Sequence, residues 1–192
     1  MGWKVHRPDS KRKGARLRFI EIEVPGAFLV EIEPVIDERG FFARTYCREE
    51  FARHGLEASF SQVSLSYNNR RCILRGLHYQ AKPHGEVKVV RCVRGVVFDV
   101  IVDLRPHSRT YCRWFGQELS EDNHKALYIP EGVAHGFLTL TDTSEVEYQI
   151  SVPYAPESAR GVRWNDPAFG IRWPDVPKVV SARDQGFEDF AR

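Results

Sequence analysis

Two side chains suited to proton transfer and anion binding lie inside a strand-like segment, ILRGLHYQ, at residues 73–80. Arg75 and His78 are three residues apart, so a regular strand would place them on opposite faces. Gly76 lies between them, and a glycine in the interior of a strand often marks a bulge or a close approach of the backbone. We therefore predict a bulge at Gly76 that turns both side chains into one cavity.

Three further polar residues accompany this pair. In EVKVVRCV (86–93), Lys88 lies on a partly apolar strand face, where an unpaired ammonium would be costly if it were buried. In EVEYQISV (145–152), Tyr148 shares a face with aliphatic residues and can place its hydroxyl in the same interior. Taken singly, Tyr148 fits a core tyrosine and Lys88 fits an exposed strand face. Together with His135, however, these residues favour a polar cavity.

A metal site is a competing interpretation of the same histidines. The sequence offers three imidazoles and one carboxylate, from His78, His84, Glu86 and His135. This donor set suits zinc, iron or manganese. The usual close pair of histidines is missing, because Tyr79 and Gln80 follow His78. The strand after Glu86 would also bring Lys88 close to any such metal. We keep this site as the less favoured alternative.

Composition bounds the class of protein. A chain of 192 residues with 42% hydrophobic and 28% charged residues is ordinary for one globular domain. The net charge of +2 favours neither nucleic acid nor a membrane surface as a partner. Basic residues crowd positions 1–17, which we expect to form a solvated, partly mobile N-terminus; an arm that binds nucleic acid is the alternative.

Several features favour a cytoplasmic location. No apolar segment follows the basic N-terminus, so we expect no secretory signal, and no apolar run approaches the length of a transmembrane helix. The four cysteines form no CxxC pair. Reduced thiols fit a cytoplasmic protein better than a disulfide framework or a cysteine-based metal site.

Short strand-like segments dominate the chain. Apolar stretches bounded by turn residues lie at 18–24, 27–32, 86–93, 96–104, 126–129, 136–140 and 145–152. Residues 94–95 predict a hairpin between two of these segments, and residues 141–144 predict another turn. Helical patterns are few: residues 48–54 predict two turns ended by Gly55, and residues 120–123 predict the start of one more.

This pattern predicts the fold class. Many short strands with almost no helix imply an all-β sandwich, jelly roll or barrel, and disfavour a doubly wound α/β fold. We expect the tail from Trp164 onward, rich in proline and aromatic residues, to wrap the surface or cap one end of a barrel. Without a Gly-rich phosphate loop, a repeat or a linker, residues 1–192 are predicted to form a single domain.

Several segments together resemble a known family. They are DERGFF (37–42), ILRGLHYQ (73–80) with Lys88, FDVIVDLRPHS (98–108), IPEGVAHGF (129–137), EVEYQ (145–149), WNDPAFGIRWP (164–174) and SARDQ (181–185). In this order they are similar to the dTDP-4-dehydrorhamnose 3,5-epimerase family. The resemblance implies a cupin-type jelly roll with a few short helices, assembly as a homodimer, a nucleotide-sugar substrate, and chemistry that needs neither a cofactor nor a metal.

The resemblance also implies roles for individual residues. His78 matches the catalytic base, Tyr148 the proton donor, and Asp184 the carboxylate that orients the histidine. Lys88 matches the residue that faces the keto oxygen of the sugar. Forked arginine donors suit a pyrophosphate, and the residues expected to hold the nucleotide-sugar are Arg39, Arg75 and His135.

The chemistry of such a reaction fits these residue types. A 4-keto sugar has acidic C–H bonds at the two carbons beside the carbonyl, and a neutral imidazole can remove such a proton. Negative charge then develops on the carbonyl oxygen, where a cation such as Lys88 stabilises the enolate more than the ketone. Epimerisation returns the proton to the opposite face, which calls for a second acid on another strand, such as Tyr148.

Four departures from the family pattern concern the substrate. Many members have a glutamate at the positions of Arg44 and Ala159. This chain also has Glu86 where the family has a glutamine, and QVS (62–64) where the family has a QxN segment.

We predict an epimerase of a nucleotide-linked 4-keto-6-deoxyhexose, of the dTDP-4-dehydro-6-deoxyglucose 3,5-epimerase type. The alternatives are a single-centre 3- or 5-epimerase or keto-sugar isomerase acting on another NDP-sugar, a metal-dependent cupin, and a non-catalytic sugar-binding cupin.

Overall fold

The computed structural model describes residues 15–191. The basic N-terminus predicted over residues 1–17 therefore lies mostly outside the described residues. Its last three positions belong to the folded body, because strand β1 (Arg16–Glu21) begins there and Leu17 is buried.

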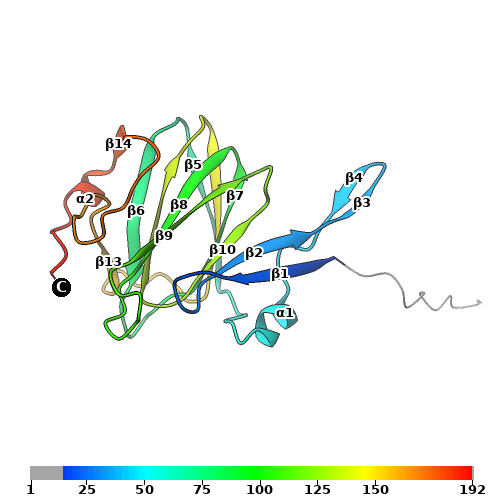
Figure 1. Cartoon of the computed structure of the whole chain (residues 1–192), viewed down its shortest axis with the longest axis horizontal. Helices are drawn as coiled ribbons and strands as arrows, with labels where there is room; N and C mark the ends of the chain where they lie inside the picture. The colour runs from blue at the N-terminus through cyan, green and yellow to red at the C-terminus, as the bar shows by residue number, and fades with distance from the viewer. Residues whose placement is uncertain (1–14, 192) are drawn as a thin grey trace, which may run out of the picture.

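Two β-sheets face each other and make up the body of the molecule (Figure 1). The first is antiparallel, with the spatial order β1, β2 (Phe28–Glu33), β10 (Ala126–Ile129), β7 (Lys88–Arg94), β12 (Ser144–Ile150) and β5 (Gln62–Asn68). The second has the order β13 (Ala159–Gly161), β6 (Ile73–Gln80), β11 (Val133–Thr139), β8 (Val96–Asp103) and β9 (Trp114–Ser120). A small hairpin, β3 (Val35–Asp37) and β4 (Gly40–Phe42), projects from this body. The predicted all-β class is confirmed.

The hairpin predicted at residues 94–95 is wrong. Strand β7 pairs with β10 and β12 in the first sheet, whereas β8 pairs with β11 and β9 in the second. Gly95, with φ of +72°, therefore turns the chain from one sheet to the other. The turn at 141–144 likewise joins β11 to β12 across the two sheets. Turn residues signal a reversal of the chain, but they do not tell whether the next strand pairs with the last one.

Apolar residues fill three layers. One cluster lies between the sheets and includes Val90 of β7 and Phe137 of β11. A second covers the outer face of the first sheet, where Phe51 of helix α1 (Arg48–Arg53) packs on strand residues such as Val89. A third lies between the second sheet and the C-terminal tail and includes Phe169. Neighbouring residues of β7 thus point to opposite layers, as the alternation in 86–93 predicted.

The helices and the tail match the sequence expectations in part. Helix α1 is present and is followed by Gly55 with φ of +69°. Residues 121–123 form a turn after the last residue of β9 and no helix, and Ser120 and Asn123 exchange side-chain to backbone hydrogen bonds across it. The tail wraps the second sheet, where it adds the parallel strand β14 (Val179–Val180) to β6 and then forms helix α2 (Ala182–Gln185). No helix within residues 15–191 is long and apolar enough to cross a membrane.

Candidate active site

A cavity of about 700 Å³ opens between the two sheets. Strands β7 and β12 of the first sheet, β6 and β11 of the second, and helix α2 all contribute to its walls. These elements bring together most of the residues expected at the site, namely Arg75, His78, Lys88, His135, Tyr148 and Asp184.

A bulge in β6 explains how Arg75 and His78 reach the same cavity. The register of β6 against β11 shifts between these residues, so that two residues of β6 oppose one residue, Gly136, of β11. Gly76 has φ of +119°, which favours glycine. A Cβ atom at Gly76 would lie 2.6 Å from the Gly136 Cα and 2.7 Å from the His135 carbonyl oxygen. The predicted bulge at Gly76 is confirmed.

His78 is paired with the carboxylate of Asp184 from helix α2. Its Nε2 lies 2.7 Å from Asp184 Oδ1, while Oδ2 accepts a hydrogen bond from the Gly76 backbone N–H at 3.1 Å. Burial raises the pKa of Asp184, but the hydrogen bonds from His78 and Gly76 outweigh it and hold this pKa below its usual value. An ionised Asp184 only accepts hydrogen bonds, so Nε2 of His78 donates the proton that they share, and in the neutral imidazole the lone pair then lies on Nδ1.

Lys88 points into the cavity from the first sheet. Its side chain is only 9% exposed, which places it on the inner face that strand alternation allowed. The ammonium nitrogen lies 2.7 Å from Glu86 Oε1 and donates to the carbonyl oxygen of His78 at 3.3 Å. A positive charge is thus fixed between the two sheets, close to the strand that carries His78.

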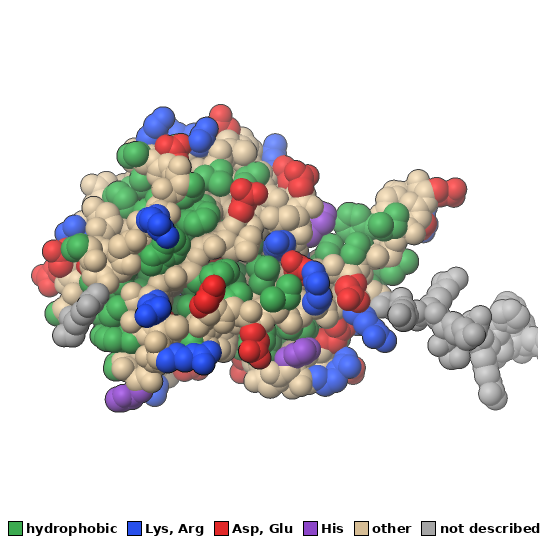
Figure 2. Space-filling model, in the orientation of Figure 1, with side chains coloured by type: hydrophobic (Ala, Val, Ile, Leu, Met, Phe, Trp, Pro, Cys, Tyr) green, Lys and Arg blue, Asp and Glu red, His purple; other side chains and the backbone are tan. Residues whose placement is uncertain are grey.

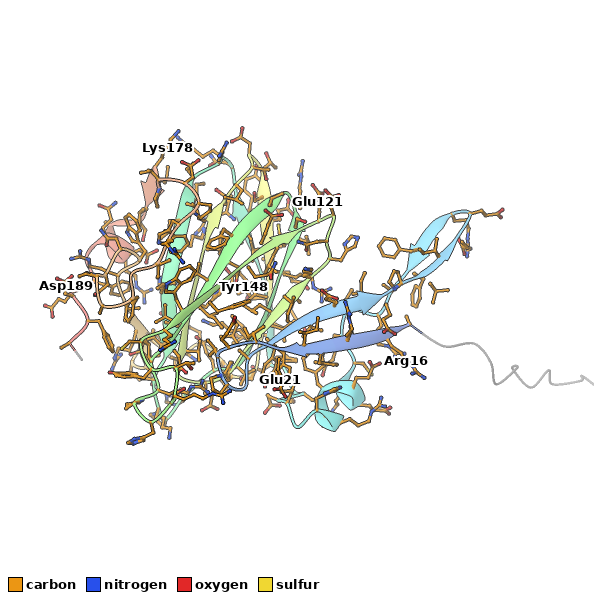
Figure 3. The ribbon with its side chains drawn as sticks, in the orientation of Figure 1. Arg16, Glu21, Glu121, Tyr148, Lys178 and Asp189 are labelled. Carbon is orange, nitrogen blue, oxygen red and sulfur yellow. The ribbon has the colours of Figure 1, made fainter. Side chains whose placement is uncertain are left out.

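Tyr148, labelled in Figure 3, enters the cavity from β12 of the first sheet. Its ring packs edge to face against His135, with the ring centres 5.8 Å apart. Burial raises the pKa of Tyr148, the charge of Asp99 raises it further, and Arg75 opposes both. The phenol therefore keeps its proton, and within residues 15–191 its hydroxyl has no hydrogen-bond partner.

His135 has a carboxylate partner that sequence reasoning missed. Its Nε2 lies 2.8 Å from Asp99 Oδ2, and both side chains are buried. The second oxygen, Asp99 Oδ1, is buried without a hydrogen-bond partner in the described part of the chain. Burial raises the pKa of Asp99, although the charges of His135 and Lys88 lower it. An aspartate within the apolar run FDVIVDL was the available signal for this residue.

Arg75 lies at the open side of the cavity. Its Nε donates to Asn68 Oδ1 at 2.7 Å, and its guanidinium also donates to the Tyr67 carbonyl at 3.3 Å. No carboxylate within residues 15–191 forms an ion pair with this guanidinium. Two further cationic residues line the same cavity and were not singled out from the sequence, Arg160 and Arg183.

The four residues of the alternative metal site do not converge. Each has a different partner: His84 Nδ1 lies 3.0 Å from Ser158 Oγ, and the other three bind the partners described above. Among residues 15–191, no group of three or more His, Cys, Asp and Glu side chains is arranged to hold a metal ion. The geometry therefore gives no support to this ligand set.

Arg39 is the expected site residue that lies away from the cavity. It stands at the tip of the β3–β4 hairpin, with its side chain 83% exposed and paired with Asp37. Of the departures from the family pattern, Arg44 also lies outside the cavity and pairs with Glu50 of α1 at 2.6 Å. Ala159, in contrast, lines the cavity wall.

Comparisons with known proteins bear on this arrangement. The sequence profile described as dTDP-4-dehydrorhamnose 3,5-epimerase matches residues 21–192. A protein of that name from Methanothermobacter thermautotrophicus is 47% identical, over 91% of this chain and 95% of its own.

Solved structures agree with these sequence matches. An enzyme of the same name from Bacillus anthracis, crystallised with TDP and pyrophosphate, superposes with a TM-score of 0.88 at 36% identity, over 91% of this chain and all of its own. A 3'-monoepimerase from Streptomyces bikiniensis, in complex with dTDP-quinovose, superposes with a TM-score of 0.81 at 34% identity, over 88% of this chain and 86% of its own. The chain therefore belongs to the dTDP-4-dehydrorhamnose 3,5-epimerase family, a family of isomerases with a cupin-like fold.

Proposed function

We propose that this protein inverts C3 and C5 of dTDP-4-dehydro-6-deoxyglucose. One observation carries the proposal: His78 and Tyr148 line the same cavity from opposite sheets, with the ammonium of Lys88 also in its wall. Inversion at a carbon next to a ketone needs a base on one face of the sugar and an acid on the other. The two sheets supply one each.

His78 is the base in this proposal, and Nδ1 is the atom that accepts the proton. Nε2 is occupied by its hydrogen bond to Asp184, whose lowered pKa keeps the carboxylate ionised. Asp184 also stabilises the imidazolium that forms when Nδ1 takes the proton. The His78 side chain is 37% exposed, so water can remove that proton again between turnovers.

Lys88 and Tyr148 complete the proton transfer. As the C–H bond breaks, its electron pair moves into the enolate, and the negative charge on the oxygen is stabilised by the Lys88 ammonium. Tyr148 then gives its phenolic proton to the same carbon from the opposite face. The reaction moves protons without net oxidation, and solvent then takes the extra proton from His78 and returns a proton to Tyr148.

The diphosphate of the substrate is expected at the open side of the cavity. Arg75 presents a guanidinium there, and a planar fork of N–H donors matches phosphate oxygens. His135, buried deeper, is proposed to hold the sugar. The relative from Bacillus anthracis, which was crystallised with TDP and pyrophosphate, supports a nucleotide-sugar as the substrate.

We also propose a homodimer in which Arg39 serves the cavity of a second copy. The β3–β4 hairpin exposes large hydrophobic side chains, including Ile36 at 76% and Phe42 at 73%, and Figure 2 shows this apolar surface on the projecting arm. Strand β5, at the edge of the first sheet, exposes Val63 and Leu65 as well. Apolar surface of this kind is typical of an interface between protein chains.

Subunit mixing tests the dimer and the role of Arg39 together. Light scattering should give twice the mass of one chain. His78→Ala and Arg39→Ala variants should each be weak alone and regain activity when mixed, because a hybrid dimer restores one complete cavity. A monomer of full activity, or mixtures without recovery, would contradict this assignment of Arg39.

Solvent exchange tests the reaction itself. With dTDP-4-dehydro-6-deoxyglucose in D₂O, we expect deuterium at C3 and C5 by proton NMR. Absence of label with any nucleotide-linked 4-keto-6-deoxy sugar would reject an epimerase. The family member that is a 3'-monoepimerase supports a second candidate, inversion of one centre, and label at C3 alone would select it.

A cytoplasmic location is the last part of the proposal. All four cysteines are free thiols, and three of them are buried. Unpaired thiols are typical of a reducing compartment. The proposed reaction involves neither nucleic acid nor a membrane.

A further inference from the structure

The glutamate beside Lys88 has no part in the mechanism above. Glu86 lies two residues before Lys88, in the segment that leads into β7, and it lines the same cavity. The Glu86 side chain is 11% exposed and that of Lys88 is 9% exposed, and Glu86 Oε1 lies 2.7 Å from Lys88 Nζ. The carboxylate and the ammonium therefore form a nearly enclosed ion pair in the cavity wall.

We propose that Glu86 is a positioning residue that orients the ammonium of Lys88 for the enolate. An ammonium has three N–H donors. One is engaged by Glu86 Oε1 and a second by the His78 carbonyl oxygen, 3.3 Å from Nζ. Together with the bond to Cε, these two contacts fix the direction of the third N–H, which is left for the keto oxygen of the sugar.

The two contacts hold the ammonium from both sides of the cavity. Glu86 belongs to the chain entering the first sheet, whereas the His78 carbonyl belongs to β6 of the second sheet, in the residue that supplies the base. The cation and the base are therefore kept in one geometry before substrate binds. Lysine has a long flexible side chain, and without Glu86 only the 3.3 Å contact would restrain its end.

The charge of Glu86 strengthens this restraint. Hydrogen bonds between ionised groups are shorter and stronger than neutral ones. A glutamine can still offer a carbonyl oxygen at this position, but it lacks the negative charge, whereas alanine offers neither. The series glutamate, glutamine, alanine therefore separates the acceptor from its charge.

The first test observes the Lys88 ammonium directly. In the protein labelled with ¹⁵N-lysine, we expect a protected ammonium signal that disappears in Lys88→Met, which assigns it. Glu86→Ala should increase the hydrogen-exchange rate of this signal about 10- to 100-fold, and Glu86→Gln by a smaller factor. Glu31→Gln is the matched control, because Glu31 also pairs with a lysine, Lys125, at 3.5 Å but lies outside the cavity.

The second test is kinetic, and this part rests on the proposed epimerisation. A misplacement of about 1 Å costs roughly a hundredfold in rate. Glu86→Ala should therefore lower kcat about 30- to 100-fold with KM changed less than about threefold. Glu86→Gln should recover most of the loss, and Glu31→Gln should match the unaltered protein in kcat.

The two tests fail in distinguishable ways. If Glu86→Ala leaves the exchange of the Lys88 ammonium unchanged, or if Glu86→Gln turns over faster than the unaltered protein, Glu86 does not position the lysine. If the unaltered protein acts on no keto sugar, the proposed function fails, and the ammonium spectra alone decide whether Glu86 holds Lys88.

Discussion

Two histidine–carboxylate pairs have their histidines on adjacent strands of the second sheet, yet they differ in almost everything except their residue types. His78 on β6 and His135 on β11 face each other in the strand register. The two nitrogen-to-oxygen distances are nearly the same, 2.7 Å to Asp184 and 2.8 Å to Asp99. The geometry of each pair alone therefore does not tell which one moves protons.

The surroundings separate the two pairs. Asp184 receives a further hydrogen bond from a backbone N–H, its pKa is lowered, and the His78 side chain is 37% exposed. Asp99 is completely buried with one oxygen unpartnered among the described residues, its pKa is raised by burial, and the His135 side chain is 3% exposed. A base must exchange its proton with solvent, and only His78 has the access and the firmly ionised partner that this requires.

Replacing each histidine in turn should give the largest contrast. General-base assistance contributes about 10²- to 10⁴-fold, so His78→Asn should reduce deuterium incorporation and turnover by about two to four orders of magnitude. His135→Asn should act mainly through binding, with KM raised about tenfold and exchange retained. Circular dichroism and thermal unfolding check the fold of both variants. Equal losses of exchange would show that the two pairs are not distinct in role.

Removing the proposed acid, Tyr148, should separate proton removal from inversion. Tyr148→Phe keeps the ring packing against His135 but deletes the phenolic proton. Epimerised product should form about 100- to 1,000-fold more slowly, while His78 still exchanges deuterium into the unchanged isomer at a measurable rate. Proton NMR resolves the two isomers. If deuterium exchange and inversion slow by the same factor, the result would contradict separate roles for His78 as base and Tyr148 as acid.

The bulge that brings His78 into the cavity can be tested through stability. Ala at Gly76 combines an unfavourable φ with contacts under 3 Å to Gly136 and the His135 carbonyl. Gly40 is a matched control, because its φ of +123° is similar and nothing lies within 4 Å of its Cβ position. In urea unfolding, Gly76→Ala should lose about 3–5 kcal/mol and Gly40→Ala about 1–3 kcal/mol. Equal losses would mean that the close approach of β6 to β11 at Gly76 contributes nothing to the free energy of unfolding lost in Gly76→Ala.

Strand alternation was enough to predict part of this site. It put Tyr148 on an inner face and Lys88 on a partly apolar face that left an exposed position open, and the glycine between Arg75 and His78 predicted the bulge, because these signals are local in the sequence. Asp184 was expected only from the resemblance, since it lies 106 residues from His78 and belongs to a tail without strong periodicity.

Other features depend on tertiary placement that local patterns do not encode. The partner of His135 lies 36 residues away on a neighbouring strand, and nothing in the run around Asp99 indicates which histidine it meets. The turns at 94–95 and 141–144 look like hairpins locally but connect opposite sheets. The position of Arg39 on a projecting arm likewise becomes visible only once the hairpin is placed.

The smallest effect, and the most specific to this comparison, is the pH dependence of stability. Asp184 has a native-state pKa below its unfolded value of about 3.9, so its contribution is present above about pH 4 and is lost as the pH falls through the native pKa. Asp99 has a raised native-state pKa, so its contribution is present below about pH 4 and is lost as the pH rises through that pKa.

Asp184→Asn and Asp99→Asn should therefore change stability with opposite pH slopes. Measured by urea unfolding between about pH 3 and 6, the cost of Asp184→Asn should grow with pH to about 1–2 kcal/mol, as the charged hydrogen bonds to His78 and Gly76 become available. The cost of Asp99→Asn should shrink over the same range, because the amide never has to ionise in a buried place. Slopes of the same sign would show that the two carboxylates share one electrostatic environment, and the assignment of His78 as the only base would lose its physical reason.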